Sequence, residues 1–368
     1  MFESFSELFA LGLSPFFVQQ LHEAPEGVLG RVACERRGQY EIQTAQGVLQ
    51  AALSGRLLHV LPEDDRPTVG DWVVLQIADP VCRVEHVLER QGVLRRASVD
   101  GSSRAQNLAA NVDLCCIVAA CSNGDVHTRR RALNPNRIQR YLTTAENCRI
   151  PALVWLNKAD VLSPEEAEAA RDELLSVLPH ARVLLLSART GLGLAELRAE
   201  LPRGNSAVLL GSSGVGKSTI VNALLGSDVQ NTSPERADDS RGRHTTTERQ
   251  LLQLAHGGLL IDTPGMRELA LWADADDEAS PGFADIAAFA EHCHFRDCQH
   301  QGEPGCAVEA AIDAGQLGPE RLAQLHKLER ELRHQRARVD VRLRQAEHNR
   351  WKLIGRANRK RQRLTGKT

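Results

Sequence analysis

The sequence lacks any long hydrophobic run. None of its 368 residues belongs to a stretch of about 18 consecutive apolar residues, the length that a membrane-spanning helix needs. The opening residues, MFESFSELFA, have no basic cluster and carry Glu3 and Glu7, so they do not resemble a secretory signal. We therefore expect a soluble, cytoplasmic protein with no membrane partner.

The sequence also lacks the regular cysteine spacing of a disulfide-rich secreted domain. Six of its nine cysteines lie in apolar or strand-like surroundings and are expected to be buried free thiols: Cys34, Cys82, Cys115, Cys116, Cys121 and Cys148. The other three lie close together near the C-terminal end of the sequence. They are the better candidates for chemistry.

Strong charge of one sign is absent overall but present at one end. The net charge is −2, yet residues 327–368 carry 15 Lys and Arg against 4 Asp and Glu, a balance of +11. The remaining residues therefore sum to −13. A basic arm on an acidic body predicts a polyanionic partner. With 42% hydrophobic and 25% charged residues, the composition is that of globular domains and excludes wholesale disorder.

The patterns divide the chain into several domains. Residues 1–27 form an apolar N-terminal extension, expected to make a short helix and a turn. Residues 28–96 contain short strand-like runs, which favour a small β-barrel of the OB-fold type: GVLGRVACE, YEIQTA, GVLQAAL, RLLHVL, VGDWVVLQI and CRVEHVLER. A polar linker is expected over about 97–107.

The central region, 108–272, has a different texture. Apolar strands alternate with helical segments such as NPNRIQRYLTTAE and SPEEAEAARDELLSVL, which predicts an α/β domain with a parallel sheet. Ser163 can cap the second of these helices. Residues 273–345 are mostly helical and charged, and 346–368 form a basic tail. The predicted fold class is therefore a multidomain protein with barrel, α/β and helical parts.

One segment of the α/β domain has the pattern of a phosphate-binding loop. Residues 211–219 fit G-x-x-x-x-G-K-[ST] between a predicted strand and a predicted helix, and their backbone N–H groups can surround phosphates. Lys217 can reach the β- and γ-phosphates and Ser218 can bind magnesium. The loop residues are Gly211, Ser212, Ser213, Gly214, Val215, Gly216, Lys217, Ser218 and Thr219.

Two further strand ends carry residues that can recognise the base. Asn157, Lys158 and Asp160 follow the strand ALVWL, and an aspartate there can accept hydrogen bonds from the N1–H and N2 amino groups of guanine. Ser187 and Ala188 follow RVLLL, where a backbone N–H can donate to guanine O6. Ligands of parallel sheets bind at such carboxyl ends. Together the motifs predict a guanine-nucleotide site.

A third strand end completes the predicted site. Asp262 would hold magnesium through a water molecule, and the N–H of Gly265 would sense the γ-phosphate. In the polar stretch between the phosphate-binding loop and the strand that ends at Asp262, one threonine of 245–247 would complete the set of magnesium ligands. We favour Thr246, although the triplet leaves the register open.

The order of these motifs is permuted, because the base-reading motifs precede the phosphate loop. In this respect the chain resembles the circularly permuted GTPases of bacteria that depend on the small ribosomal subunit, over about residues 28–345. The resemblance implies an OB-fold, a circularly permuted P-loop GTPase domain and a C-terminal zinc-binding domain. It also implies a magnesium-dependent GTP hydrolase that acts in late maturation of the small subunit.

The expected reaction is attack of water on the γ-phosphate, with charge stabilised by magnesium and Lys217. Met266 occupies the place of a Ras-type glutamine and cannot orient water, so His244 is the candidate catalytic residue. The resemblance implies the same role for it. A purely structural loop histidine is the alternative.

The clustered cysteines predict one structural zinc ion. Cys293, Cys298 and Cys306 lie within 14 residues, and three thiolates with one imidazole make a closed tetrahedral site. His292 and His294 are alternative imidazoles, but His300 fits the pattern that the resemblance implies. Because this module follows Asp262 closely along the chain, we expect it to respond to nucleotide state.

The remaining expectations concern partners. Candidate stacking groups on the barrel are Tyr40 and Trp72, although a core position is favoured for Trp72. The basic tail suits contact with rRNA phosphates. Candidate phosphate contacts are Arg31, Arg36, Arg37, Arg95, Arg96 and Arg104. The expected partners are GTP or GDP and the small ribosomal subunit with its rRNA, bound by a monomer. A permuted GTPase serving another RNA, or an RNA-binding factor that nucleotide merely stabilises, are the alternatives.

Overall fold

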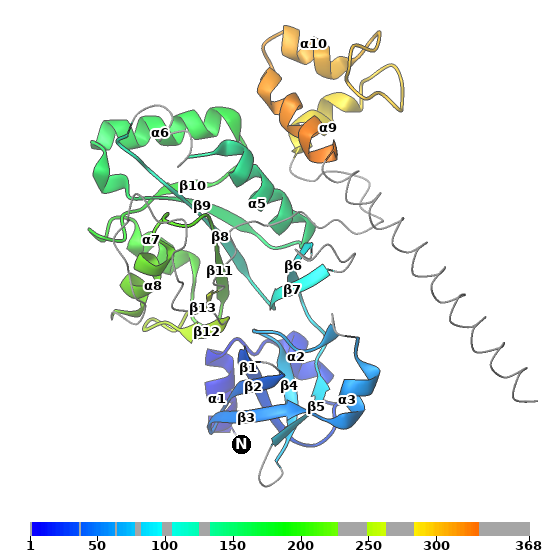
Figure 1. Ribbon diagram of the computed structural model, residues 1–368, viewed down its shortest axis with the longest axis vertical. Coiled ribbons are helices and arrows are strands. Elements are labelled where there is room, and N and C mark those ends of the chain that lie inside the picture. Colours follow the sequence, from blue (N-terminus) through cyan, green and yellow to red (C-terminus); the bar gives the residue numbers. More distant parts are fainter. Residues whose placement is uncertain are drawn as a thin grey trace, which may run out of the picture.

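The computed structural model describes residues 2–36, 38–62, 65–77, 82–97, 105–124, 133–226, 249–262 and 283–330. Figure 1 shows a small barrel at one end, an α/β sheet with its helices in the middle, and a helical module at the other end. None of the helices in these ranges combines the length and the apolar character needed to cross a bilayer.

The barrel is formed by five strands around an apolar core. Strand β1 pairs with both β2 and β4, and β3 pairs with β5, which closes the sheet on itself. Its core contains Val32, Ile42 and Val73. The strands are β1 (Val28–Arg36), β2 (Gln39–Thr44), β3 (Gly47–Leu53), β4 (Trp72–Gln76) and β5 (Cys82–Val87).

One predicted strand of the barrel is wrong. The run RLLHVL lies in a helix, α3 (Gly55–Val60), whose N-cap Ser54 accepts a hydrogen bond from the N–H of Leu57 at 3.4 Å. The cap satisfies a backbone donor at the helix start, and Leu57 packs inward while Leu58 and Val60 remain exposed. A short apolar run fits either element, and here the cap decides for the helix.

The N-terminal extension packs on the barrel, but it forms two short helices where the sequence predicts one helix and a turn. They are α1 (Phe2–Ala10) and α2 (Pro15–Gln20). Phe17 is buried against Trp72, with ring centroids 5.9 Å apart. Leu8 and Leu11 belong to the same apolar cluster.

The predicted polar linker is partly a strand. Strand β6 (Val93–Ala97) pairs antiparallel with β7 (Ala105–Ala110), so residues 105–107 are not loop. Leu94 and Leu108, one from each strand, are buried in the core of the α/β domain. The hairpin therefore packs with the sheet that follows it.

The central sheet has the strand order β10-β9-β8-β11-β13-β12, in which β12 alone runs antiparallel to its neighbour β13. Its strands are β8 (Leu114–Ala120), β9 (Ala152–Asn157), β10 (Val183–Leu185), β11 (Ser206–Leu210), β12 (Gln250–Gln253) and β13 (Leu259–Asp262). Strand β12 also pairs with β1 through Gln250 and Cys34, which joins the sheet to the barrel.

Helices cover both faces of this sheet, as predicted from the alternating texture. Val154 and Leu156 of β9 pack toward α5 and α6, whereas Leu153 and Trp155 pack toward α7 and α8. The strand period of two sends neighbouring side chains to opposite faces. The helices are α5 (Pro135–Asn147), α6 (Pro164–Val177), α7 (Leu194–Glu200) and α8 (Lys217–Leu225).

The C-terminal module is helical and has a small core of its own. Phe283 and Ile286 pack against Val308 and Leu322. Its helices are α9 (Ala284–Ala290), α10 (Ala307–Asp313) and a helix over 319–330. The loop between α9 and α10 carries the three clustered cysteines.

Candidate guanine-nucleotide site and metal cluster

The predicted nucleotide motifs lie at one edge of the central sheet. Strands β9, β10, β11 and β13 run parallel, so their carboxyl ends meet at the same edge (Figure 1). Each of these ends carries one of the motifs. This is the position at which ligands bind in open α/β sheets.

The phosphate loop connects β11 to α8 and has the backbone that the motif requires. Gly214 and Gly216 have φ values of 82° and 93°, a region that favours glycine. A side chain at Gly216 would collide with the amide of Asn157. The ammonium of Lys217 donates to the carbonyls of Gly211 at 2.7 Å and Ser212 at 2.8 Å, so it lies over the loop.

Asn157 joins the three loops of the site. This buried side chain, 2% exposed, donates through Nδ2 to the carbonyl of Val215 at 2.8 Å. Its Oδ1 accepts the N–H of Ala188 at 3.1 Å. A single amide therefore fixes the phosphate loop relative to the segment expected to recognise guanine O6.

Asp160 lies in a short 3-10 helix, η2 (Ala159–Val161), and its carboxylate is oriented by two neighbours. The hydroxyl of Ser187 donates to Oδ1 at 2.5 Å, and Arg189 pairs with Oδ2 at 2.5 Å. Burial works to raise the pKa of Asp160, but these two groups outweigh it and hold the pKa below its ordinary value. At neutral pH the group is a carboxylate, the form that accepts hydrogen bonds.

The magnesium side of the site is described in part. Asp262 ends β13, beside the phosphate-loop strand β11, and Ser218 lies in the first turn of α8. A hydroxyl and a carboxylate at neighbouring strand ends are oxygen ligands of the kind that Mg²⁺ takes. His244, Thr246, Gly265 and Met266 lie outside the described residues.

The cluster in the C-terminal module brings four ligand atoms together. Cys293 Sγ lies 3.7 Å from His300 Nδ1 and 4.0 Å from Cys306 Sγ. His300 Nδ1 lies 3.3 Å from Cys306 Sγ, and with Cys298 the four atoms are all within 4.8 Å of one another. Zinc bonds of about 2.0–2.3 Å can reach all four, so the donor set fits one zinc ion.

The thiols behave as a group that favours a cation. Burial would raise the pKa of Cys293, but backbone N–H groups of Ala307 and Val308 donate to it and lower the pKa. The pKa of Cys298 is raised to about 12 by burial and by the thiols of Cys306 and Cys293. The raised pKa of Cys298 reflects the cost of a second thiolate beside the first, and a bound divalent cation would offset this cost. His294 instead contacts Phe295, with ring centroids 4.7 Å apart.

Two predicted RNA contacts of the barrel, Tyr40 and Arg31, are wrong, whereas Trp72 takes the core position that the sequence favours. Trp72 and Tyr40 are 0% and 1% exposed, so neither can stack on a base. Arg31 is 1% exposed and donates to backbone carbonyls inside the protein. Arg36 is exposed and pairs with Glu41 at 3.4 Å. Arg37, Arg104 and the side chain of Arg96 lie outside the described residues.

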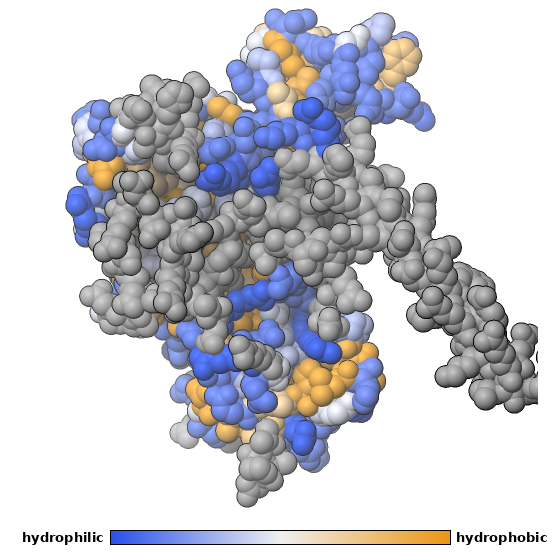
Figure 2. Space-filling model, in the orientation of Figure 1, coloured by the Kyte–Doolittle hydropathy of each residue, from blue (hydrophilic) through white to orange (hydrophobic). Residues whose placement is uncertain are grey.

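The surface shows where polar and apolar groups gather. Figure 2 shows an apolar area on the barrel near α3, whereas the C-terminal module is largely hydrophilic. The exposed apolar side chains in this part of the barrel include Leu58 and Val60.

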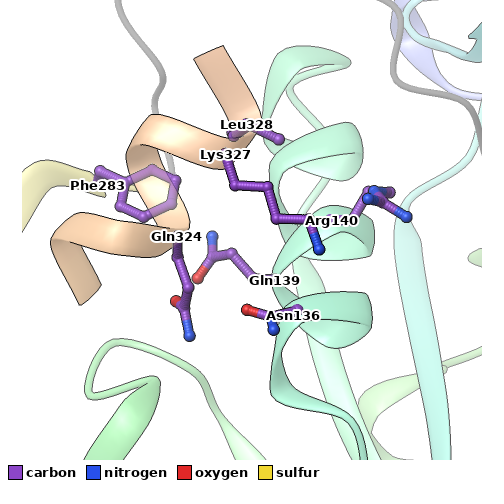
Figure 3. A pocket seen from close by; sticks show the side chains of 7 residues that line it. All are labelled: Asn136, Gln139, Arg140, Phe283, Gln324, Lys327 and Leu328. Atoms are coloured by element: carbon purple, nitrogen blue, oxygen red, sulfur yellow. The ribbon is translucent and has the colours of Figure 1, made fainter. Parts of the chain in front are cut away.

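Sequence reasoning missed the contact between the C-terminal module and α5. The guanidinium of Arg321, 5% exposed, donates to Gln139 Oε1 at 2.6 Å and pairs with Asp285 at 2.7 Å. Its Cζ lies 4.2 Å from the ring centroid of Phe283. A small cavity of about 20 Å³ lies between α5 and the C-terminal module. Figure 3 shows side chains that line it, among them Gln139 and Phe283. Nothing in the sequence around Arg321, which lies in a charged helix, indicates a partner as distant along the chain as Gln139.

Comparison with known families agrees with the motif geometry. Residues 87–272 match the family model described as RsgA GTPase. A protein from Opitutus terrae named small ribosomal subunit biogenesis GTPase RsgA is 40% identical, over 98% of this chain and 99% of its own length. A Vibrio vulnificus relative named RsgA 2 is 41% identical over 87% of this chain and 86% of its own.

Solved structures confirm the predicted architecture. YjeQ from Thermotoga maritima superposes with a TM-score of 0.61 at 24% identity, over 83% of this chain and 98% of its own. YloQ, described as a circularly permuted GTPase, gives a TM-score of 0.60 at 22% identity, over 85% and 98%. The fold is thus a circularly permuted GTPase with an N-terminal closed barrel and a helical C-terminal module. From the family match, the full-length relatives and the shared fold, this chain belongs to the RsgA GTPase family.

Proposed function

We propose that this chain hydrolyses GTP on the small ribosomal subunit and acts in the late maturation of that subunit, with hydrolysis coupled to release. The observation that carries the proposal is the junction at Asn157, which ties a phosphate loop to a guanine-reading loop. The names of the full-length relatives, small ribosomal subunit biogenesis GTPase, supply the partner.

Each motif then has a role in nucleotide binding. The N–H groups of 211–219 surround the phosphates at the start of α8, whose positive end favours anions. Asp160 accepts the N1–H and amino groups of guanine, and Ala188 N–H donates to O6. Lys158 and Ser187 hold this loop, and Gly265 N–H contacts the γ-phosphate.

The catalytic step needs charge neutralisation and an oriented water. Ser218, Asp262 and Thr246 would hold Mg²⁺, which would supply positive charge to neutralise the charge that develops on the phosphates. Lys217 adds positive charge once its ammonium turns from the loop carbonyls to the phosphates. Because Met266 cannot orient water, His244 positions the attacking molecule.

The other modules bind the ribosome. We propose that the barrel and the basic tail contact rRNA and that the zinc ion, held by Cys293, Cys298, His300 and Cys306, has a structural role in the C-terminal module. A closed Cys₃His set leaves no open position for catalysis. The chain acts in the cytoplasm. It acts as a monomer, because a ribosomal subunit offers a single asymmetric site.

The test is GTP hydrolysis by the purified chain alone and with small subunits, large subunits or naked rRNA. We expect strong stimulation by small subunits only. Lys217→Ala should abolish the stimulated rate, since it removes the cation at the phosphates, and should leave zinc content unchanged.

Two outcomes would contradict the proposal. Equal, slow rates in all four mixtures would exclude the ribosomal partner and favour another RNA. Stimulated hydrolysis by Lys217→Ala at the wild-type rate would exclude the assigned catalytic site.

A further inference from the structure

The zinc-ligand loop holds its histidine in a costly backbone conformation. His300 has a φ of 56°, in the left-handed region that residues other than glycine seldom adopt. A residue keeps such a conformation only where the surrounding structure holds it in place. In this conformation His300 Nδ1 faces the thiols of Cys293 and Cys306.

A carboxylate that is not a ligand holds both sides of this histidine. Glu303 Oε1 accepts the N–H of Gln299 at 2.9 Å, and Oε2 accepts the N–H of Gln301 at 2.6 Å. The two donors belong to the residues before and after His300. The Gln299 N–H belongs to the peptide unit that joins Cys298 to Gln299, and the Gln301 N–H to the unit that joins His300 to Gln301. The carboxylate therefore bridges the backbone across His300.

The same loop is anchored at two other points. The carbonyl of Glu303 accepts the N–H of Cys306 at 3.1 Å, so one residue connects the third and fourth ligands of the cluster. On the other side, His326 Nε2 lies 2.9 Å from the carbonyl of Gln299. Among these contacts, the Glu303 carboxylate is the one that accepts hydrogen bonds from both sides of His300.

We propose that Glu303 is a positioning residue for zinc: its carboxylate pre-forms the loop that presents His300 and so raises the zinc affinity of the module. The inference rests on the proposed zinc site. Loss of groups that orient metal ligands typically lowers metal affinity about 10- to 100-fold. Glu303→Ala removes the acceptor of both backbone N–H groups, so its zinc affinity should be lower than that of the wild type by a factor in that range. Glu303→Gln keeps one acceptor oxygen and should give a smaller loss.

The experiment measures zinc affinity of the full-length chain by competition with a chromogenic chelator. Glu291→Ala is the matched control, because it removes an exposed carboxylate at the end of α9, in the same module but outside the loop. We expect wild-type affinity for this control. Cobalt absorption of each variant reports whether the imidazole remains a ligand, and Glu303→Ala should show the spectrum of a site without it.

A double variant separates positioning from a general loss of structure. If Glu303 acts through His300, then Glu303→Ala should cause no further loss of zinc affinity when His300 is already alanine. Wild-type zinc affinity in Glu303→Ala, or a full additional loss in the His300→Ala background, would overturn the proposal. A wild-type chain that binds no zinc would instead refute the zinc site itself.

Discussion

At the scale of single residues, Asp160 is the residue that we propose selects the base. Its two oxygens are held by Ser187 and Arg189, and guanine presents two donors to this carboxylate in the proposed complex. Xanthine has a carbonyl where guanine has its amino group. An asparagine amide would donate to that carbonyl and would face the guanine amino group with a donor.

Asp160→Asn should therefore exchange the base preference. We expect GDP affinity to fall about 10- to 100-fold, because charge-assisted hydrogen bonds contribute about 1.5–3 kcal/mol, while XDP affinity rises. Isothermal titration of both nucleotides measures the change. Asp172→Asn, an exposed carboxylate on α6, is the control and should bind GDP like the wild type. Equal loss of GDP and XDP binding by Asp160→Asn would contradict the assignment.

The pKa of Asp160 sets the pH range of this recognition. Because the folded-state pKa lies below the ordinary value near 3.9, the contribution of the charged group is complete above that value and is lost as pH falls through the lower, folded pKa. Asp160 is therefore ionised throughout the neutral range, and its ability to accept guanine donors does not depend on pH there.

The sequence could predict single residues wherever chemistry requires a spacing. The phosphate loop, the NKAD segment and the Cys₃His cluster are motifs of this kind. Asn157 of the NKAD segment contacts the phosphate loop, and the four residues of the Cys₃His cluster lie together in the C-terminal module. Arg31 and Tyr40 failed as surface predictions because residue type alone does not reveal burial. A buried arginine needs acceptors, and those of Arg31 come from segments up to 175 residues away in sequence.

At the scale of elements, local capping explains where helices begin. Ser163 accepts the N–H of Glu166 at 3.2 Å, and the Glu166 carboxylate accepts the N–H of Ser163 at 2.9 Å. This capping box starts α6 at Pro164 as the sequence predicted. Buried Ala167 and Leu174 then place the helix on the sheet.

Ser163→Ala should destabilise the GTPase domain by about 1 kcal/mol, because one backbone donor of the first turn loses its acceptor. In scanning calorimetry the unfolding midpoint of this domain should fall by about 2–4 °C. Ser176→Ala changes an exposed hydroxyl near the other end of the same helix and should shift the midpoint much less. Equal shifts in the two variants would show that the cap has no special role.

Helices and strands were harder to predict where a segment is too short for its hydrophobic pattern to distinguish the two. The run RLLHVL is six residues long and apolar, and only the Ser54 cap distinguishes its helix from a strand. The hairpin of β6 and β7 was missed because polar residues interrupt both strands. Leu94 and Leu108 fix it to the core, but one buried leucine in each strand does not make a recognisable strand pattern. Long alternating segments such as α5 and β9 carried enough signal to be assigned.

At the scale of the whole molecule, buried arginines connect the modules. Arg321 joins the C-terminal module to α5 through Gln139. Arg31 of the barrel strand β1 donates to Leu11 of the N-terminal extension at 2.6 Å and to Gly70 of the barrel at 3.0 Å. It also donates to the carbonyl of Asn111, at the start of the GTPase domain, at 3.0 Å.

The position of Arg31 gives the N-terminal extension a structural role. Burial lowers the pKa of Arg31 to about 10, with Asp113 and Asp71 opposing the shift, so the group is a cation at neutral pH. A buried cation is tolerated when all its donors are satisfied. The extension supplies one of these acceptors, the carbonyl of Leu11. Arg31 and the pairing of β1 with β12 together fix the barrel to the GTPase domain.

Arg31→Ala should therefore loosen the whole N-terminal half. It removes the donor to the buried carbonyl of Leu11, whereas the carbonyls of Gly70 and Asn111 keep Asn111 Nδ2 and Ser206 Oγ as donors. A buried acceptor that loses its donor costs about 1–3 kcal/mol. Arg36→Ala is the matched control on the same strand, because its side chain is 48% exposed and its ion pair with Glu41 contributes at most about 1 kcal/mol. Urea unfolding of the two variants compares the losses directly. If Arg31→Ala unfolds at the same urea concentration as Arg36→Ala, the buried guanidinium does not hold the modules together. The backbone contacts between them, such as the β1–β12 pairing and the bond from Ala110 N–H to the Val69 carbonyl, then do so instead.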